Sequence, residues 1–273
     1  QRNLGLARVS EPVTLMPDDD SLWFPDTAAK FMEVYDRDTE GLIGGVAGIN
    51  SASPLTESNA PERDHALHRN PTVQYWRNKV EKHFAPQPFD IYAQLQIADL
   101  LPSAHEQGLA DLKPVESIAG YRMSFRTGTV REFGFDPMLG SRVGYALHED
   151  KDLGLRMQKA GYLLVAAPGA RVFHNIHPGK RAGGFAYGFS WLFNYAYICR
   201  KVWGDSPPGR GPVLRYLRYK QFLYRLRMIN AHHRDIARGG AAALAEFDRI
   251  WQTPDNRLAE AYGEICDRVL ARA

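Results

Sequence analysis

Residues 12–26 read PVTLMPDDDSLWFPD, a short apolar segment that runs directly into three aspartates. The segment at 12–16 is β-prone and bounded by turn residues, which is typical of a buried strand. Three adjacent carboxylates repel one another, so folding alone seldom calls for them. They follow the C-terminal end of the predicted strand, where open α/β sheets bind ligands. This stretch therefore predicts a core strand and a candidate site at its end.

Strand and helix patterns alternate on the C-terminal side of this stretch. A helix is predicted to open at Pro25-Asp26, and a glycine-rich apolar run predicts a strand at 41–49. Further strands are predicted at 117–127 and on both sides of a Pro-Gly turn within 162–174, and helices at 129–134, 148–162 and 183–203. This alternation places the chain in the α/β class.

The chain has 273 residues, which suits one large domain with an appendage. We expect a catalytic domain at 1–204 and a helical extension at 205–273, formed by one basic helix and a second amphipathic helix that reaches Ala273. Pro, Ser and Asn are frequent at about 50–115, so we interpret this region as an insertion, with one helix at about 72–83.

Charge and cysteine content exclude several classes of protein. A net charge of +3 is too small a bias to indicate nucleic acid as a partner. No apolar run approaches the roughly 20 residues of a membrane span. The two cysteines, Cys199 and Cys266, form neither a disulfide framework nor a metal cluster, which favours a cytoplasmic protein.

The three aspartates suit a divalent cation. Alternation along an extended backbone places Asp18 and Asp20 on one side and Asp19 on the other. Two converging carboxylates suit Mg²⁺ or Mn²⁺, which take oxygen ligands and commonly bridge to a substrate diphosphate. The alternative is a solvated acidic turn that caps the following helix.

Two further groups have similar double interpretations. Glu149 and Asp150 open the helix predicted at 148–162, where acids are stabilised by the helix dipole but where a general base is also held rigidly. His174 ends a predicted strand and suits a metal ligand, although a lone histidine is usually an ordinary polar residue. In the loop after it, Lys180 and Arg181 could bind phosphate or simply be solvated.

Three segments together resemble one enzyme family: QRNLGLARVSEPVTLMPDDDS at 1–21, SIAGYRMSFRTGTVREFGFDPML at 117–139 and GYALHEDKDLGLRMQKAGYLLVAAPGARVFH at 144–174. Their order and spacing resemble inverting glycosyltransferases of the GT-A fold, family-2 type, including the DxD motif. The resemblance implies a Rossmann-like mixed sheet flanked by helices and a cation, Mn²⁺ or Mg²⁺. It also implies a nucleoside-diphosphate sugar as donor.

The resemblance assigns roles to the same residues. Asp20 and His174 would ligate the metal, and Asp18 would share the metal or contact the ribose. Asp150 would deprotonate the acceptor hydroxyl, and Glu149 would contact sugar or acceptor. The other expected substrate-binding residues are Arg2, Asn3, Asp19, Gly120 and Arg181.

The resemblance leaves the acceptor open: a glycan, a lipid-linked molecule or another hydroxyl compound, as in polysaccharide biosynthesis. The first strands of this family's fold would precede Gln1, so we expect them to be missing from this sequence or supplied by another chain. The segment LRYLRYKQFLYRLRM at 214–228 suits either a peripheral contact with the inner face of the membrane or a packed basic helix.

Two other functions remain open at this stage. A nucleotidyltransferase on a similar scaffold would also bind nucleotides through carboxylates and a metal, but would not need Asp150 as a base. A non-catalytic module that binds carbohydrate or a protein partner would keep the fold without turnover.

Overall fold

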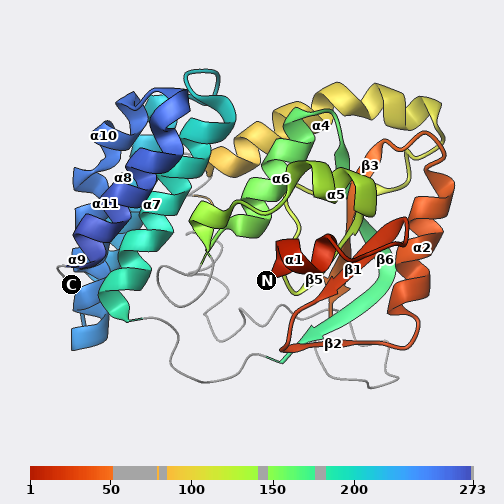
Figure 1. Ribbon diagram of the computed structural model, residues 1–273, viewed down its shortest axis with the longest axis horizontal. Coiled ribbons are helices and arrows are strands. Elements are labelled where there is room, and N and C mark those ends of the chain that lie inside the picture. The colour runs from red at the N-terminus through yellow and green to blue at the C-terminus, as the bar shows by residue number, and fades with distance from the viewer. Residues whose placement is uncertain (52–78, 80–84, 141–146, 176–182, 272–273) are drawn as a thin grey trace. The chain divides into compact units, whose positions relative to one another are not determined.

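The computed structural model describes residues 1–51, 79, 85–140, 147–175 and 183–271 (Figure 1). It divides into two compact units. The first unit comprises Gln1–Lys79, Ala93–Phe135 and Leu153–Pro178, and the second comprises Val80–Tyr92, Asp136–Asp152 and Gly179–Ala273. The second unit therefore contains the C-terminal helices together with two segments from the middle of the chain.

The first unit is built on a six-stranded mixed sheet with the order β1-β5-β3-β6-β2, with β4 paired to β6. The strands are β1 (Val13–Pro17), β2 (Ser21–Trp23), β3 (Ile43–Asn50), β4 (Lys113–Pro114), β5 (Arg122–Arg126) and β6 (Leu163–His174). β3 and β6 are parallel, and the other pairs are antiparallel. The predicted α/β class and the mixed sheet flanked by helices are confirmed.

Helices cover both faces of this sheet, as the alternation of buried residues along β6 shows. Leu163 and Val165 belong to one apolar cluster, which also contains Phe31 of α2 (Thr27–Arg37). Leu164, between them, belongs to a second cluster. That second cluster contains residues of α1 (Arg2–Leu6), α5 (Thr127–Phe133) and α6 (Glu149–Lys159). Successive side chains of a strand point to opposite faces, so both faces are buried.

Five predicted elements agree with the structure to within a few residues. The predicted strands at 12–16 and 41–49 correspond to β1 and β3. The predicted helices that open at Pro25-Asp26 and span 129–134 and 148–162 correspond to α2, α5 and α6. The strand–turn–strand predicted within 162–174 was wrong, because β6 is one strand of 12 residues. Its parallel register with β3 shifts from Ala47↔Ala166 to Ile49↔Arg171. The Pro-Gly dipeptide therefore lies in a bulge, where a missing N–H is tolerated and the strand continues.

Two other predictions require correction. The strand predicted at 117–127 begins only at Arg122, whose N–H donates to the Ala119 carbonyl (3.1 Å) in a turn. The helix α4 (Pro88–Glu106) was not predicted, because its apolar residues do not keep to one face and it contains Pro102, which disfavours a helix interior. The helix predicted at 72–83 lies outside the described residues, apart from position 79.

The second unit is helical. It contains α7 (Gly184–Trp203), α8 (Arg210–Leu226), α9 (Ala231–Ala245), α10 (Phe247–Gln252) and α11 (Leu258–Leu270). The single helix predicted after α8 is thus three helices, because Glu246 ends α9 and Pro254 follows the end of α10. Within the described residues, no helix is both long and apolar enough to cross a bilayer.

Candidate functional site

Strand pairing brings Asp20 and His174 together in the first unit. β2 pairs antiparallel with β6 so that Ser21 is opposite His174, and the Asn175 N–H donates to the Asp20 carbonyl (2.8 Å). Nε2 of His174 lies 3.1 Å from Oδ1 of Asp20. Both side chains remain about one-fifth exposed, at 21% and 22%. An imidazole nitrogen and a carboxylate oxygen therefore face each other at the edge of the sheet. The facing oxygen, Oδ1 of Asp20, is itself buried, although both side chains are partly exposed.

The His174 ring is held by an aromatic residue that sequence reasoning missed. Tyr121 stacks on it with ring centroids 4.2 Å apart and an interplanar angle of 9°. The guanidinium carbon of Arg122 lies 5.4 Å from the centroid of the Tyr121 ring. Gly120 precedes Tyr121 in the turn before β5. The only sequence signal was an aromatic residue beside this glycine, which is too common a pattern to indicate a site.

Asp18 and Asp19 lie in the turn between β1 and β2. The Asp18 carbonyl accepts hydrogen bonds from the Ser21 N–H (3.1 Å) and Oγ (2.8 Å), which closes the turn. The Asp18 carboxylate lies 3.7 Å from Nη2 of Arg2, and Asp19 is exposed. Asp18 thus faces a cation from α1 and is open to solvent beside it.

The Asn3 side chain is engaged in a structural contact. Its Nδ2 donates to the Phe135 carbonyl, and its Oδ1 accepts from the Phe135 N–H, both at 2.8 Å. The guanidinium carbon of Arg2 lies 5.3 Å from the centroid of the same phenylalanine ring. A contact between the Asn3 amide and a nucleotide would therefore have to replace or share these two hydrogen bonds.

The residues that meet suit a divalent cation only in part. Asp20 offers an oxygen and His174 a nitrogen, a donor pair that Mn²⁺ accepts. In the described part of the chain, no three His, Cys, Asp or Glu side chains are grouped to hold a metal ion, so Asp18 does not complete a cluster with these two. Substrate oxygens and water would have to fill the remaining positions, as is common for Mg²⁺ and Mn²⁺ sites.

Glu149 and Asp150 are the first residues of α6 and lie in the second unit. Both are half-buried, and Oδ1 of Asp150 accepts a hydrogen bond from the Lys151 N–H (2.8 Å). The residue before them, His148, has a positive φ of 68°, which is uncommon outside glycine. Arg181 and Lys180 lie outside the described residues, so the predicted phosphate contacts stay predictions.

His148 is enclosed by aromatic rings. The ring centroids of Trp191, Tyr195 and Phe89 lie 4.9, 5.8 and 6.0 Å from its own, each in an edge-on arrangement. Burial lowers the pKa of His148 to about 3, with a further contribution from the positive charge of Lys151. This imidazole is therefore neutral at physiological pH and holds the backbone directly before the predicted base.

An ion-pair network connects the first turn of α6 with α7. Nζ of Lys201 lies 2.5 Å from Oδ1 of Asp152 and 2.5 Å from Oδ2 of Asp136. The Tyr197 hydroxyl donates to the same Asp136 oxygen (2.9 Å). Burial alone would raise the pKa of Asp136, but the charge of Lys201 and these hydrogen bonds outweigh it, so the pKa is lowered. The network fixes the helix turn that carries Glu149 and Asp150.

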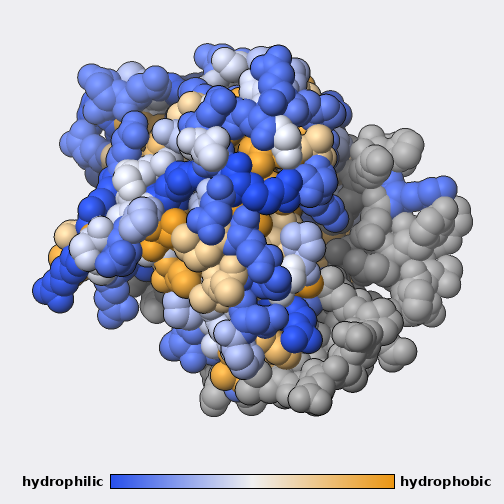
Figure 2. Space-filling view, turned by 90° about the vertical axis from the view of Figure 1, so that its right-hand side faces the viewer, coloured by the Kyte–Doolittle hydropathy of each residue, from blue (hydrophilic) through white to orange (hydrophobic). Residues whose placement is uncertain are grey.

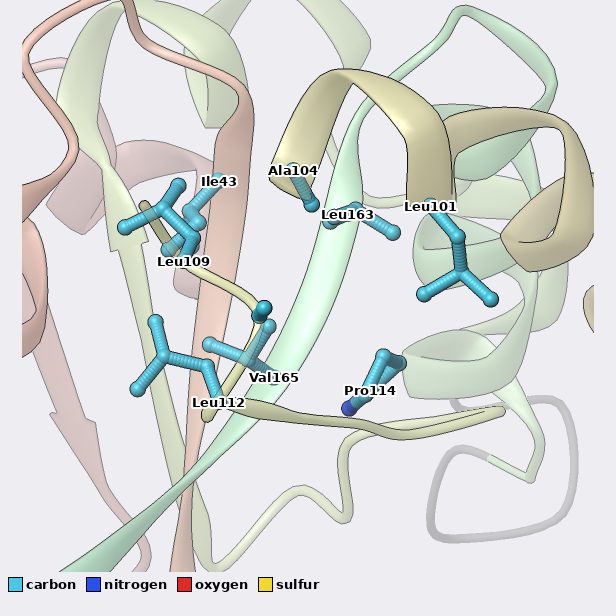
Figure 3. A pocket seen from close by; sticks show the side chains of 9 residues that line it. Ile43, Leu101, Ala104, Leu109, Leu112, Pro114, Leu163 and Val165 are labelled. Carbon is cyan, nitrogen blue, oxygen red and sulfur yellow. The ribbon is translucent and has the colours of Figure 1, made fainter. Parts of the chain in front are cut away.

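A small apolar pocket lies elsewhere on the first unit. Its volume is about 40 Å³, and its lining residues are Ile43, Leu101, Ala104, Leu109, Ala110, Leu112, Pro114, Leu163 and Val165 (Figure 3). It adjoins the start of β6, and His174 lies at the other end of that strand. At a rise of about 3.3 Å per residue, the two ends are roughly 35 Å apart. The pocket is too small for a nucleotide sugar.

Figure 2 shows the side on which α2 lies, where hydrophobic residues gather at the centre of a mainly hydrophilic face.

No protein-family model and no curated protein sequence matches this chain. Among solved structures, it is similar to the mannosyltransferase PcManGT from Pyrobaculum calidifontis in complex with GDP-Man and Mn²⁺. The TM-score is 0.39 at 15% sequence identity, and the match covers 98% of this chain. It covers 63% of that protein, so this chain spans less than two thirds of its length.

Proposed function

We propose that this protein is a metal-dependent inverting glycosyltransferase of the GT-A, family-2 type. It transfers a sugar from a nucleoside diphosphate to an acceptor hydroxyl. The observation that carries the proposal is the contact between Asp20 and His174, at 3.1 Å. These two residues are far apart in the sequence, and both are predicted metal ligands. Asp20 lies directly before β2, and His174 ends β6.

Asp20, His174 and Asp18 are the proposed residues of the donor side. Asp20 and His174 would hold Mn²⁺ or Mg²⁺, which when bound would act as a Lewis acid for the negative charge on the leaving diphosphate. Tyr121 keeps the imidazole plane fixed, so the nitrogen is oriented before the ion arrives. Asp18, with Arg2 beside it, contacts the ribose, and its exposure leaves room for that contact.

Asp150 is the proposed base. Asp150, held at the start of α6, removes the proton from the acceptor hydroxyl as that oxygen attacks the anomeric carbon. The attack comes from the face opposite the diphosphate and inverts the anomeric centre. One carboxylate is enough, because no covalent glycosyl intermediate forms. Glu149, the adjacent residue of the same turn, contacts sugar or acceptor.

Thermal unfolding with nucleotides tests this proposal. A ligand that binds the native state raises the apparent stability by mass action. We expect UDP, GDP or dTDP to raise the melting temperature only with Mn²⁺ present, and Asp20→Ala to abolish that shift. A shift without metal dependence, or the same shift in Asp20→Ala, would contradict the metal site.

Product analysis then defines the reaction. The protein is incubated with a sugar derivative of the nucleoside diphosphate that binds, together with a set of hydroxyl acceptors. This incubation should release the nucleoside diphosphate. Release of pyrophosphate would instead identify a nucleotidyltransferase. Binding without any product, across a set of hydroxyl acceptors, would identify a module that binds nucleotide sugars without turnover.

A further inference from the structure

The outer face of α8 and the turn after it expose an apolar patch. Eight large hydrophobic residues are exposed in the described part of the chain, and four of them lie within 222–229. They are Phe222 (54%), Leu226 (64%), Met228 (44%) and Ile229 (81%). Scattered exposed apolar residues are ordinary, but such a concentration marks an interaction site.

The helix periodicity shows that this patch is a second, outward face of α8. The buried residues Val213, Tyr216, Leu217 and Gln221 form its inner face. The exposed side chains recur at helical spacing on the other face: Arg215, Arg218, Phe222, Arg225 and Leu226. The apolar side chains of the outer face are therefore interleaved with arginines.

The charge around the patch has a single sign. Residues 206–234 contain seven Arg and Lys and no Asp or Glu. Arg210 pairs with Asp248. Within the described residues, the four arginines at 215, 218, 225 and 227 have no ion pair with a carboxylate. An anionic surface would complement this charge.

The apolar component distinguishes between anionic partners. A nucleic acid would need cations for its phosphates and aromatic platforms for its bases, but it offers nothing to Leu226 or Ile229. A bilayer surface satisfies both components, since lipid headgroups meet the arginines and the acyl-chain boundary receives the apolar side chains. Arginine side chains also suit this depth, because their stems are apolar and their heads are polar.

We propose that the outer face of α8 and residues 227–229 bind a membrane surface that carries anionic lipids. The helix lies in the plane of the interface, with Phe222, Leu226, Met228 and Ile229 inserted at the headgroup boundary. The contact is peripheral and reversible, and it does not depend on the proposed transfer reaction.

Vesicle binding tests this proposal without any enzymatic readout. The purified chain is sedimented with vesicles of phosphatidylcholine alone and of phosphatidylcholine mixed with phosphatidylglycerol. We expect it to bind only the anionic vesicles. Raising the salt from about 0.1 M to about 1 M should release it, since the Debye length falls from about 10 Å to about 3 Å.

Paired variants separate the two components of the interaction. One double variant removes apolar side chains, Phe222→Ser with Ile229→Ser. The other removes positive charges, Arg218→Gln with Arg225→Gln. Each double variant should weaken vesicle binding at least tenfold while leaving the melting temperature unchanged. Leu95→Ser, at an exposed apolar residue of α4, should bind like the wild type. Equal binding to neutral vesicles, or unchanged binding by the paired variants, would overturn the proposal. The chain could instead fail to bind vesicles and self-associate, with the self-association lost in Phe222→Ser with Ile229→Ser. That result would assign the patch to a second copy of the chain.

Discussion

Nε2 of His174, the last residue of β6, lies 3.1 Å from Oδ1 of Asp20, the residue directly before β2. The register Ser21↔His174 imposes this contact, because it places the residue before β2 beside the last residue of β6. A carboxylate and an imidazole so placed form either a structural contact or two ligands of one ion.

His174→Gln should weaken Mn²⁺-dependent nucleotide binding about tenfold or more, because an amide can still contact Asp20 but is a poor metal ligand. Titration calorimetry with nucleoside diphosphate and Mn²⁺ measures the change. His105→Gln, at an exposed histidine of α4, is the matched control and should bind like the wild type. Unchanged metal-dependent binding in His174→Gln would leave the contact with a structural role only.

Asp150→Asn should lower the rate of transfer by a factor on the order of 10² to 10⁴ without weakening nucleotide binding, since an amide cannot accept the acceptor proton. Rates of nucleoside diphosphate release and the metal-dependent melting shift measure the two effects separately. Asp99→Asn on α4 is an exposed matched control. If Asp150→Asn turns over like the wild type, another group is the base.

The neutral, half-buried His148 should make the folded state sensitive to acid. Its pKa is lowered to about 3 by burial and by the charges of Lys151 and Lys220, whereas an unfolded histidine titrates near pH 6.5. Between these values the unfolded chain binds the extra proton, so stability falls as the pH falls, by at most about 1.4 kcal/mol per pH unit.

His148→Asn should remove this component, because asparagine tolerates a positive φ and does not titrate. Urea unfolding at several pH values between 4 and 7 measures it as the difference between the two proteins. Carboxylates titrate in both proteins and cancel in that difference. Parallel curves for the wild type and His148→Asn would show that His148 is protonated in the folded state as easily as in the unfolded one.

Gly239→Ala should destabilise the second unit by about 2 kcal/mol or more. A β-carbon at Gly239 of α9 would lie 2.0 Å from the Phe185 carbonyl oxygen and 2.7 Å from the Phe189 nitrogen of α7, so the helices would have to move apart. Gly211→Ala on α8 is the matched control: its β-carbon meets no atom within 4 Å, and alanine is the better helix former. Urea denaturation of both variants checks the prediction, which fails if Gly239→Ala is as stable as Gly211→Ala.

Lys201→Met should cost about 3 kcal/mol, because it leaves Asp152, which is fully buried, without its cation. Lys201→Met combined with Asp152→Asn should recover part of this loss, since the neutral amide no longer needs a counter-ion. Chemical denaturation of the wild type, the two single variants and the double variant gives the coupling energy. Additive effects would mean that the ion pair does not stabilise this turn.

The sequence alone determined the elements whose signals are local. β1 and β3 are short apolar runs between turn residues, and α6 has acids in its first turn and Gly161 after its end, with φ of 94°. These features act over a few residues, so periodicity and turn chemistry reveal them. The candidate residues Asp20, His174 and Asp150 were found in the same way, because each lies directly beside such an element.

The tertiary structure decided which of these residues meet and what holds them. β6 continues through Pro168 and Gly169 because its pairing with β3 resumes beyond the bulge, and that continuation carries His174 to Asp20. Tyr121 on His174, the aromatic rings around His148 and the Lys201 network depend on residues brought together from distant parts of the chain. Such contacts follow from strand register and helix packing, which are set by the burial of whole faces and leave no mark in a short stretch of sequence.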